Sequence, residues 1–132
     1  MKRNIQNEMK ELFGNSCLCY SYAYLTQQSD DPKALTQFVL EGWRMGYIDD
    51  DGFVSNPLAY LRLLGKKPRN IEKVKINTLG ELPKDNQFVV EYAYGTNKHF
   101  VVANYEKIVF DPAGESNTVK NGKPVSYRKI VY

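Results

Sequence analysis

The sequence predicts an α+β fold in which amino-terminal helices pack on a carboxyl-terminal antiparallel sheet. Up to about residue 65, apolar residues recur at helical spacing in segments that end at glycine or polar residues. From Ile71 onward the apolar period changes to two, which is typical of strands. Helices that precede the strands, rather than alternating with them, favour the α+β class. The 132 residues suit a single domain that covers positions 1–132.

Four helices are expected in the amino-terminal half. Gly14 ends the first helix as a carboxyl-terminal cap, and Ser16 is the expected N-cap of the second, which places Cys17 in its first turn. Pro32 and Pro57 suit the first turns of the third and fourth helices. The expected helices cover residues 2–13, 17–29, 32–45 and 57–64.

Five strands are expected in the carboxyl-terminal half. They cover residues 74–76, 87–94, 99–103, 107–110 and 125–132. A turn centred on Tyr105 would place Ala103 opposite Lys107 and His99 directly opposite Asp111. Such loops often carry a β-bulge, in which case the histidine and the aspartate would be diagonal neighbours.

Composition and charge exclude several functions. The net charge is +3, with 18 basic and 15 acidic residues spread along the chain, so no nucleic-acid partner is expected. No stretch reaches the roughly 18 apolar residues of a membrane-spanning helix. Apart from Ile5, charged and polar residues occupy positions 2–8, where a signal peptide would place its apolar segment, so we expect a cytoplasmic protein.

The two cysteines do not predict a disulfide or a metal site. Cys17 and Cys19 are two positions apart, and on a helix their side chains point about 200° apart. Zinc sites usually need three or four ligands, and the chain has one histidine. The Asp-rich turn at residues 49–52 lacks the ligand spacing of a calcium loop. We therefore expect no metal or cofactor and interpret Cys19 as a core residue.

Cys17, His99 and Asp111 are the candidate catalytic residues. In this order they supply a sulfur nucleophile, a base and a carboxylate that orients the base. Taken singly, each is typical of an ordinary structural position: a core cysteine, a strand histidine and a turn aspartate. The positive end of a helix favours a thiolate at Cys17, and the Cys17 N–H could donate to an oxyanion. Together the three residues predict a catalytic triad.

Several segments carry a family resemblance. Residues 15–21, with the run Asn-Ser-Cys-Leu-Cys-Tyr-Ser, look like the nucleophile segment of papain-like cysteine peptidases. Residues 99–102 and 111–112 resemble the histidine and aspartate segments of the double-glycine-leader peptidase branch. The Gly46-Tyr47-Ile48 run and the helix before Gly65 are similar to small bacterial proteins of spirochaete plasmids and phage-like elements. The resemblance implies a papain-like fold and hydrolysis of a peptide or protein substrate.

One position departs from that superfamily. A glutamine usually stands six residues before the nucleophile and completes the oxyanion hole, whereas this chain has Glu11 there. Gln6 and Asn15 are the alternative candidate donors. The triad favours a cysteine peptidase or amidase, while Glu11 favours a papain-like binding module that lacks activity. A thiol acyltransferase would use the same three residues, so it stays a third possibility.

Overall fold

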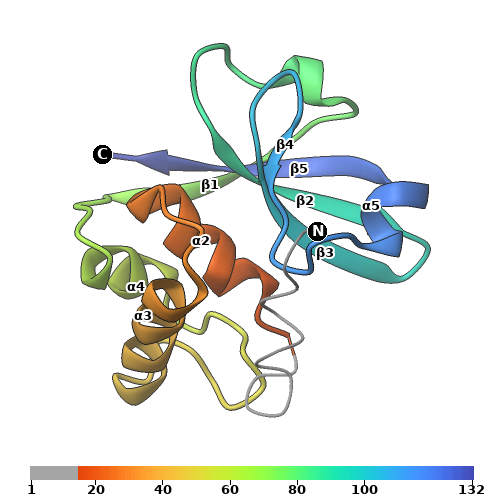
Figure 1. The fold of residues 1–132 in the computed structure, drawn as a ribbon. Helices are drawn as coiled ribbons and strands as arrows, with labels where there is room; N and C mark the ends of the chain where they lie inside the picture. The colour runs from red at the N-terminus through yellow and green to blue at the C-terminus, as the bar shows by residue number, and fades with distance from the viewer. Residues whose placement is uncertain (1–14) are drawn as a thin grey trace.

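The computed structural model describes residues 15–132 as a layer of helices over one face of an antiparallel sheet (Figure 1). The elements in chain order are helices α2 (Cys17–Gln27), α3 (Pro32–Arg44) and α4 (Pro57–Leu63), strand β1 (Asn70–Lys75), 3₁₀ helix η1 (Leu79–Glu81), strands β2 (Phe88–Tyr94), β3 (Asn97–Ala103) and β4 (Ile108–Phe110), helix α5 (Asn117–Asn121) and strand β5 (Lys123–Val131). Helices precede an open five-stranded sheet, which confirms the predicted α+β class. The helix expected over residues 2–13 lies outside the described residues.

The predicted helix starts are correct, although one cap is not. Pro32 and Pro57 occupy the first turns of α3 and α4. Asp31 and Asn56 cap these helices, accepting hydrogen bonds from the Lys33 and Ala59 backbone N–H groups. Ser16 precedes α2 as expected, but its side chain makes no capping hydrogen bond. Its backbone, at φ −102° and ψ 9°, is not in the extended conformation that a capping side chain requires.

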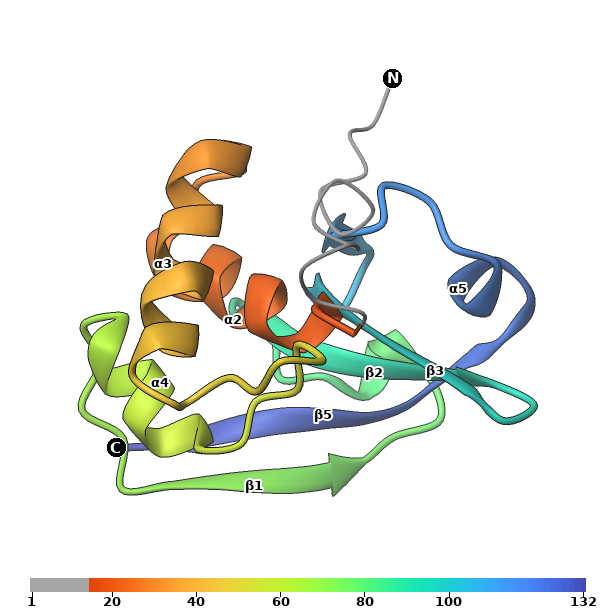
Figure 2. The same ribbon diagram turned by 90° about the horizontal axis from the view of Figure 1, so that it is seen from below.

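The sheet runs in the order β1-β5-β2-β3-β4, with every neighbouring pair antiparallel. The last strand, β5, thus lies between β1 and β2, as Figure 2 shows. Val89 packs on the helix side of β2 and Val90 on the other side, so this strand is buried on both faces, as its apolar run predicts. The short helix α5 was not expected from the sequence. It begins at Ser116, whose hydroxyl accepts from the Val119 N–H.

The turn between β3 and β4 is one residue longer than predicted. The predicted turn would place Ala103 opposite Lys107, but Ala103 pairs with Ile108. Asn104 explains the difference, because its backbone N–H donates to the Lys107 carbonyl oxygen at 3.0 Å. The Asn104 side chain also accepts from two backbone N–H groups within the turn.

A β-bulge then shifts the register by one further residue. Val102 pairs with Phe110, so β4 holds one extra residue at this point. The predicted direct pairing of His99 with Asp111 is therefore wrong. If the ladder is continued by one residue, Asp111 falls opposite Val101 and diagonal to His99. Diagonal neighbours share a face of the sheet and remain within reach of long side chains.

The core has two parts, one on each face of the sheet. Between the helices and the sheet, its buried residues are Cys19, Tyr20, Tyr22, Ala23, Leu35, Val39, Ile48, Tyr60, Leu61, Leu64, Val89, Val102 and Phe110. The Tyr60 hydroxyl donates to the Cys19 carbonyl oxygen at 3.0 Å, which ties α4 to α2. On the other face, the buried residues are Ile76, Leu82, Val90, Tyr92, Val101, Ala103 and Tyr127. The helix α2 is thus the central element of the helical layer.

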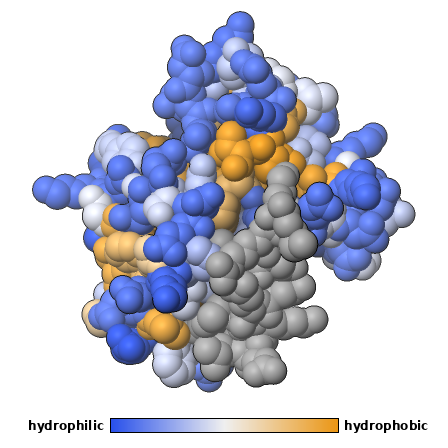
Figure 3. All heavy atoms as spheres, in the orientation of Figure 1, coloured by the Kyte–Doolittle hydropathy of each residue, from blue (hydrophilic) through white to orange (hydrophobic). Residues whose placement is uncertain are grey.

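Hydrophilic residues make up most of the face shown in Figure 3, and apolar residues form smaller patches on it. Among the helices of residues 15–132, none has the length and apolar character to cross a bilayer.

We predict that Gly42→Ala destabilises the helical layer. A Cβ atom at Gly42 would lie 2.9 Å from Ile48 Cδ1 and from ring carbons of Tyr60. Alanine normally improves a helix by about 1 kcal/mol over glycine. Here overpacking costs about 1–3 kcal/mol, because the fully buried Tyr60 ring has no room to move. Urea unfolding followed by circular dichroism should show a net loss.

Gly80→Ala is the matched control for this substitution. Its Cβ atom would meet only the Thr78 Oγ1 atom, at an ordinary 3.7 Å, so the free energy of unfolding should change by less than about 0.5 kcal/mol. A Gly42→Ala variant as stable as the wild type would contradict the packing described for α3 and α4.

Candidate active site

The packing of α2 on β3 positions Cys17. The Ser21 hydroxyl donates to the Phe100 carbonyl oxygen at 3.2 Å, and the Tyr24 ring stacks on the Phe110 ring with centroids 4.4 Å apart. Cys17 is the first residue of α2, and it is 9% exposed. The amino-terminal end of α2, which carries the Cys17 thiol, therefore lies against β3.

His99 and Asp111 form a short, buried hydrogen bond. His99 Nε2 lies 2.6 Å from Asp111 Oδ1, and the two side chains are 8% and 6% exposed. The Ala113 backbone N–H donates to the same carboxylate oxygen at 2.9 Å, and the Gly114 N–H donates to the Asp111 carbonyl oxygen at 2.8 Å. This turn fixes the carboxylate beside the imidazole.

The Cys17 thiol hydrogen-bonds the same imidazole ring. Because Asp111 occupies Nε2, the nitrogen left for the sulfur is Nδ1. The structure therefore brings the three predicted residues together in the order Cys17, His99, Asp111. They come from three elements: the start of α2, the strand β3 and the turn after β4.

The surroundings of His99 favour its protonated form. Burial of the ring lowers its pKa, but the hydrogen bonds and negative charges of Asp111 and Cys17 outweigh burial and raise the pKa to about 9. At neutral pH the imidazole therefore holds a proton between two groups that can each carry a negative charge. The imidazole is thus positioned to exchange a proton with the Cys17 thiol.

Two of the candidate oxyanion donors can be located. Asn15 is exposed, and its backbone N–H donates to the Asp51 carbonyl oxygen at 2.6 Å, so only its side chain is available. The Cys17 N–H lies in the first turn of α2, where a helix offers it no acceptor. Gln6 lies outside the described residues, as does Glu11.

Cys19 is a core residue, as its spacing from Cys17 predicts. It is fully buried, and its thiol donates to the Ser16 carbonyl oxygen at 3.2 Å. Burial raises the pKa of the Cys19 thiol far above the usual range. Within residues 15–132, no group of three or more histidine, cysteine or acidic side chains is placed to hold a metal ion.

Sequence reasoning missed Tyr92 as a neighbour of the site. Tyr92 lies directly opposite His99 on β2 and is 6% exposed. Such cross-strand pairs have Cβ atoms about 4.5–5.5 Å apart, so Tyr92 borders the imidazole on the sheet. The short turn at Gly95 and Thr96 sets this register and is the signal that could have revealed it.

Comparisons with known proteins add no relative: no protein-family model, curated protein sequence or solved structure matches this chain. The chemical interpretation of the site therefore depends on its own geometry.

We predict that His99 titrates with a pKa of about 9. It is the only histidine of the chain, so its imidazole NMR signals need no assignment. Asp111→Asn removes the charge at Nε2, and Cys17→Ala removes the group at Nδ1, so each variant should lower the pKa of His99. A wild-type pKa near the ordinary 6.5 would contradict the hydrogen-bonded arrangement.

The same titration should appear in the stability of the fold. The pKa of His99 is higher in the folded state than in the unfolded chain. The stability that protonated His99 gives to the fold is therefore fully present below pH 6.5. It is lost as pH rises through about 9, a change of up to about 3 kcal/mol in the free energy of unfolding. Urea unfolding at pH 6 and pH 10 should show this loss in the wild type and a smaller one in Asp111→Asn. Equal losses in both proteins would contradict the assignment.

Proposed function

We propose that this protein is a papain-like cysteine peptidase or amidase that hydrolyses a peptide or amide bond with Cys17, His99 and Asp111. One observation carries the proposal: a thiol at the start of a buried helix shares an imidazole with a buried carboxylate. A structural cysteine or histidine needs no such arrangement. The order of helix, sheet and histidine strand also agrees with the papain-like resemblance of the sequence.

The first chemical step is attack by the Cys17 sulfur on the substrate carbonyl carbon. The thiol proton resides on His99, and the carbonyl electrons move to oxygen as the carbon–sulfur bond forms. The Cys17 backbone N–H is placed to donate to this oxyanion. When the carbon–nitrogen bond breaks, His99 gives its proton to the leaving amine. The product is an acyl group on Cys17.

In the second step, water replaces the amine. His99 is now neutral and takes a proton from the water as it attacks the acyl carbon, after which the carbon–sulfur bond breaks and the acid leaves. Asp111 keeps the ring orientation through both steps, because its carboxylate is itself held by Ala113. The free, unbridged thiols Cys17 and Cys19 suit a reducing compartment such as the cytoplasm.

Two other functions would use the same fold. A binding module would keep the site without turnover, and the replacement of the usual glutamine by Glu11 favours it. A thiol acyltransferase would form the same acyl-cysteine and resolve it with an amine instead of water. The hydrogen bonds to His99 favour the two catalytic functions, because binding alone does not require an ionised thiol.

We predict that iodoacetamide alkylates Cys17 at pH 6, where an ordinary thiol hardly reacts. His99→Ala should slow this reaction by at least about tenfold, because the imidazolium partner of the sulfur is lost. Mass spectrometry of tryptic peptides follows the reaction at each cysteine. The buried Cys19 should stay unmodified in both folded proteins.

Cys19→Ala is the matched control, since it removes a thiol from the same helix without touching His99. Its Cys17 should react as in the wild type. If Cys17 reacts only at alkaline pH and independently of His99, the peptidase proposal fails and the binding module takes its place. If Cys17 is reactive, a thioester-forming substrate tested with and without an added amine separates hydrolysis from acyl transfer.

A further inference from the structure

We propose that the substrate is an acidic polypeptide segment, held by a cationic face of the sheet that extends from the active site to the edge strand β1. We define this cationic face by five side chains around one carboxylate: Lys73, Lys75, Lys98, Lys123 and Arg128 around Glu91. The inference rests on the proposed function in one respect, that the substrate is a polypeptide.

Strand register gathers these side chains on one face. Lys98 and Lys123 both lie opposite Ala93, from the two sides of β2, and Ala93 is two positions from Glu91. On the edge strand, Lys75 lies opposite Ser126, which in turn lies opposite Glu91. Residues that pair directly, or that are two positions apart, share a face. The cationic face thus spans β3, β2, β5 and β1.

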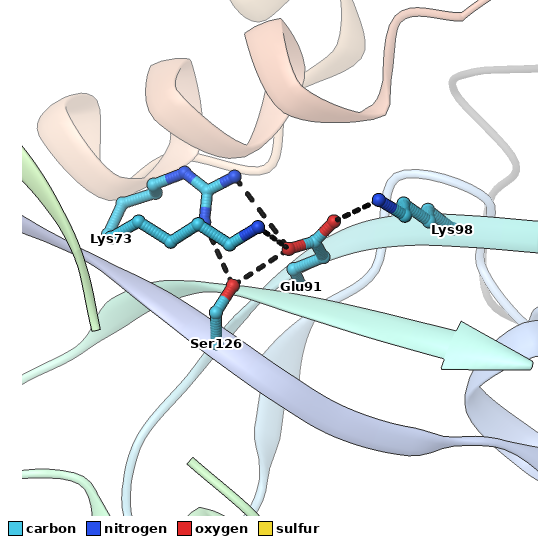
Figure 4. Close-up of polar contacts among 5 residues, drawn as sticks. Lys73, Glu91, Lys98 and Ser126 are labelled. Atoms are coloured by element: carbon cyan, nitrogen blue, oxygen red, sulfur yellow. Dashed lines mark hydrogen bonds and ion pairs between the residues drawn. The ribbon is translucent and has the colours of Figure 1, made fainter. Parts of the chain in front are cut away.

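The single Glu91 carboxylate does not neutralise the cationic face. Its carboxylate is 4% exposed, and it accepts a hydrogen bond from the Ser126 hydroxyl at 2.8 Å (Figure 4). The ammonium groups of Lys73 and Lys98 lie 3.5 and 3.8 Å from it, and the Arg128 guanidinium lies at 3.8 Å. One carboxylate therefore pairs with three cations, so the cationic face keeps a net positive charge.

The remaining two lysines border a groove. Lys75 and Lys123 are exposed, and within residues 15–132 neither has a carboxylate at ion-pair distance. A groove of about 820 Å³ lies between them, and its lining includes Lys73, Asn77 and Thr78. Ammonium, amide and hydroxyl groups can all donate hydrogen bonds to a carboxylate. The groove is therefore suited to an acidic side chain.

The cationic face begins on β3, at the residue before His99. Lys98 points to the face on which α2 packs, since Phe100, two positions on, belongs to the helix-side core, whereas the neighbouring His99 leaves the opposite side of the strand. The helix α2, which begins at Cys17, packs on the same side as Lys98. Strands lie about 4.8 Å apart, so the three steps from β3 to β1 cover roughly 14 Å. An extended peptide of four or five residues spans that distance. A substrate with its scissile bond at Cys17 would thus place acidic residues over Lys98, Lys123 and Lys75.

An acidic polypeptide fits this face better than a nucleic acid. Single-stranded nucleic acids bind through aromatic rings on which bases stack, as well as through cations. The aromatic residue that the cationic face offers is Phe100, and the Arg128 guanidinium already covers it, 5.1 Å from the ring centroid.

Binding of a fluorescein-labelled octaglutamate peptide tests the proposal. The full chain carries Cys17→Ala, so binding is measured without turnover, by fluorescence anisotropy in about 50 mM salt. Lys75→Gln with Lys123→Gln should weaken binding at least about tenfold. The control, Lys107→Gln with Lys129→Gln, changes the net charge equally at two exposed lysines outside the cationic face. It should weaken binding less than about twofold.

Three outcomes would overturn the proposal. One is equal weakening by both double variants, which would show a response to overall charge. Another is tighter binding of labelled octathymidylate than of octaglutamate, which would assign the face to nucleic acid. The third is no peptide binding, together with self-association of the Lys75→Gln, Lys123→Gln protein in size-exclusion chromatography. Alkylation of Cys17 in the otherwise native chain is a separate readout, so a failure of the peptidase chemistry cannot be mistaken for a failure of this surface.

Discussion

The axial position of α2 on the sheet is the constraint on which the rest of the structure depends. Two hydrogen bonds set it: Ser21 to the Phe100 carbonyl oxygen, and Tyr60 to the Cys19 carbonyl oxygen. Ser21, Cys19 and Tyr60 are fully buried, and a buried polar group left without its partner costs about 1–3 kcal/mol. Sliding the helix by one turn would move its end by 5.4 Å and would break both bonds. The thiol of Cys17 would then lose its contact with His99.

The three side chains of the site act as one electrostatic unit. Burial opposes a charge on His99, and the neighbouring carboxylate and thiol offset that cost from the two ring nitrogens. The titration of His99 therefore depends on both neighbours, and replacing either one alters its pKa. Burial also opposes the charge of Glu91, and there a hydroxyl and three cations around the carboxylate offset the cost. Burial alone would raise the pKa of Glu91, but these neighbours lower it.

Local features of the sequence predicted much of the fold. Prolines at helix starts, apolar periods and the doubly buried run of β2 each depend on residues near in the chain. The insertion of β5 between β1 and β2 depends on contacts between distant residues, and no local pattern encodes it. The register of β3 and β4 was missed by two residues, through the Asn104 turn and the bulge. Because a shift of two preserves the face of a strand, His99 and Asp111 still met. The three site residues were therefore predictable from the sequence, although the strand register that brings His99 and Asp111 together was not.

The positions of the two cysteines have a consequence for oxidation. Peroxide converts a reactive cysteine sulfur to a sulfenic acid, and a second thiol nearby normally returns it through a disulfide. The chain has one other thiol, Cys19, which points away around α2 into the core and bonds the Ser16 carbonyl oxygen. The helix would have to unwind before the two sulfurs could join. An oxidised Cys17 would thus depend on a thiol from another molecule for its repair.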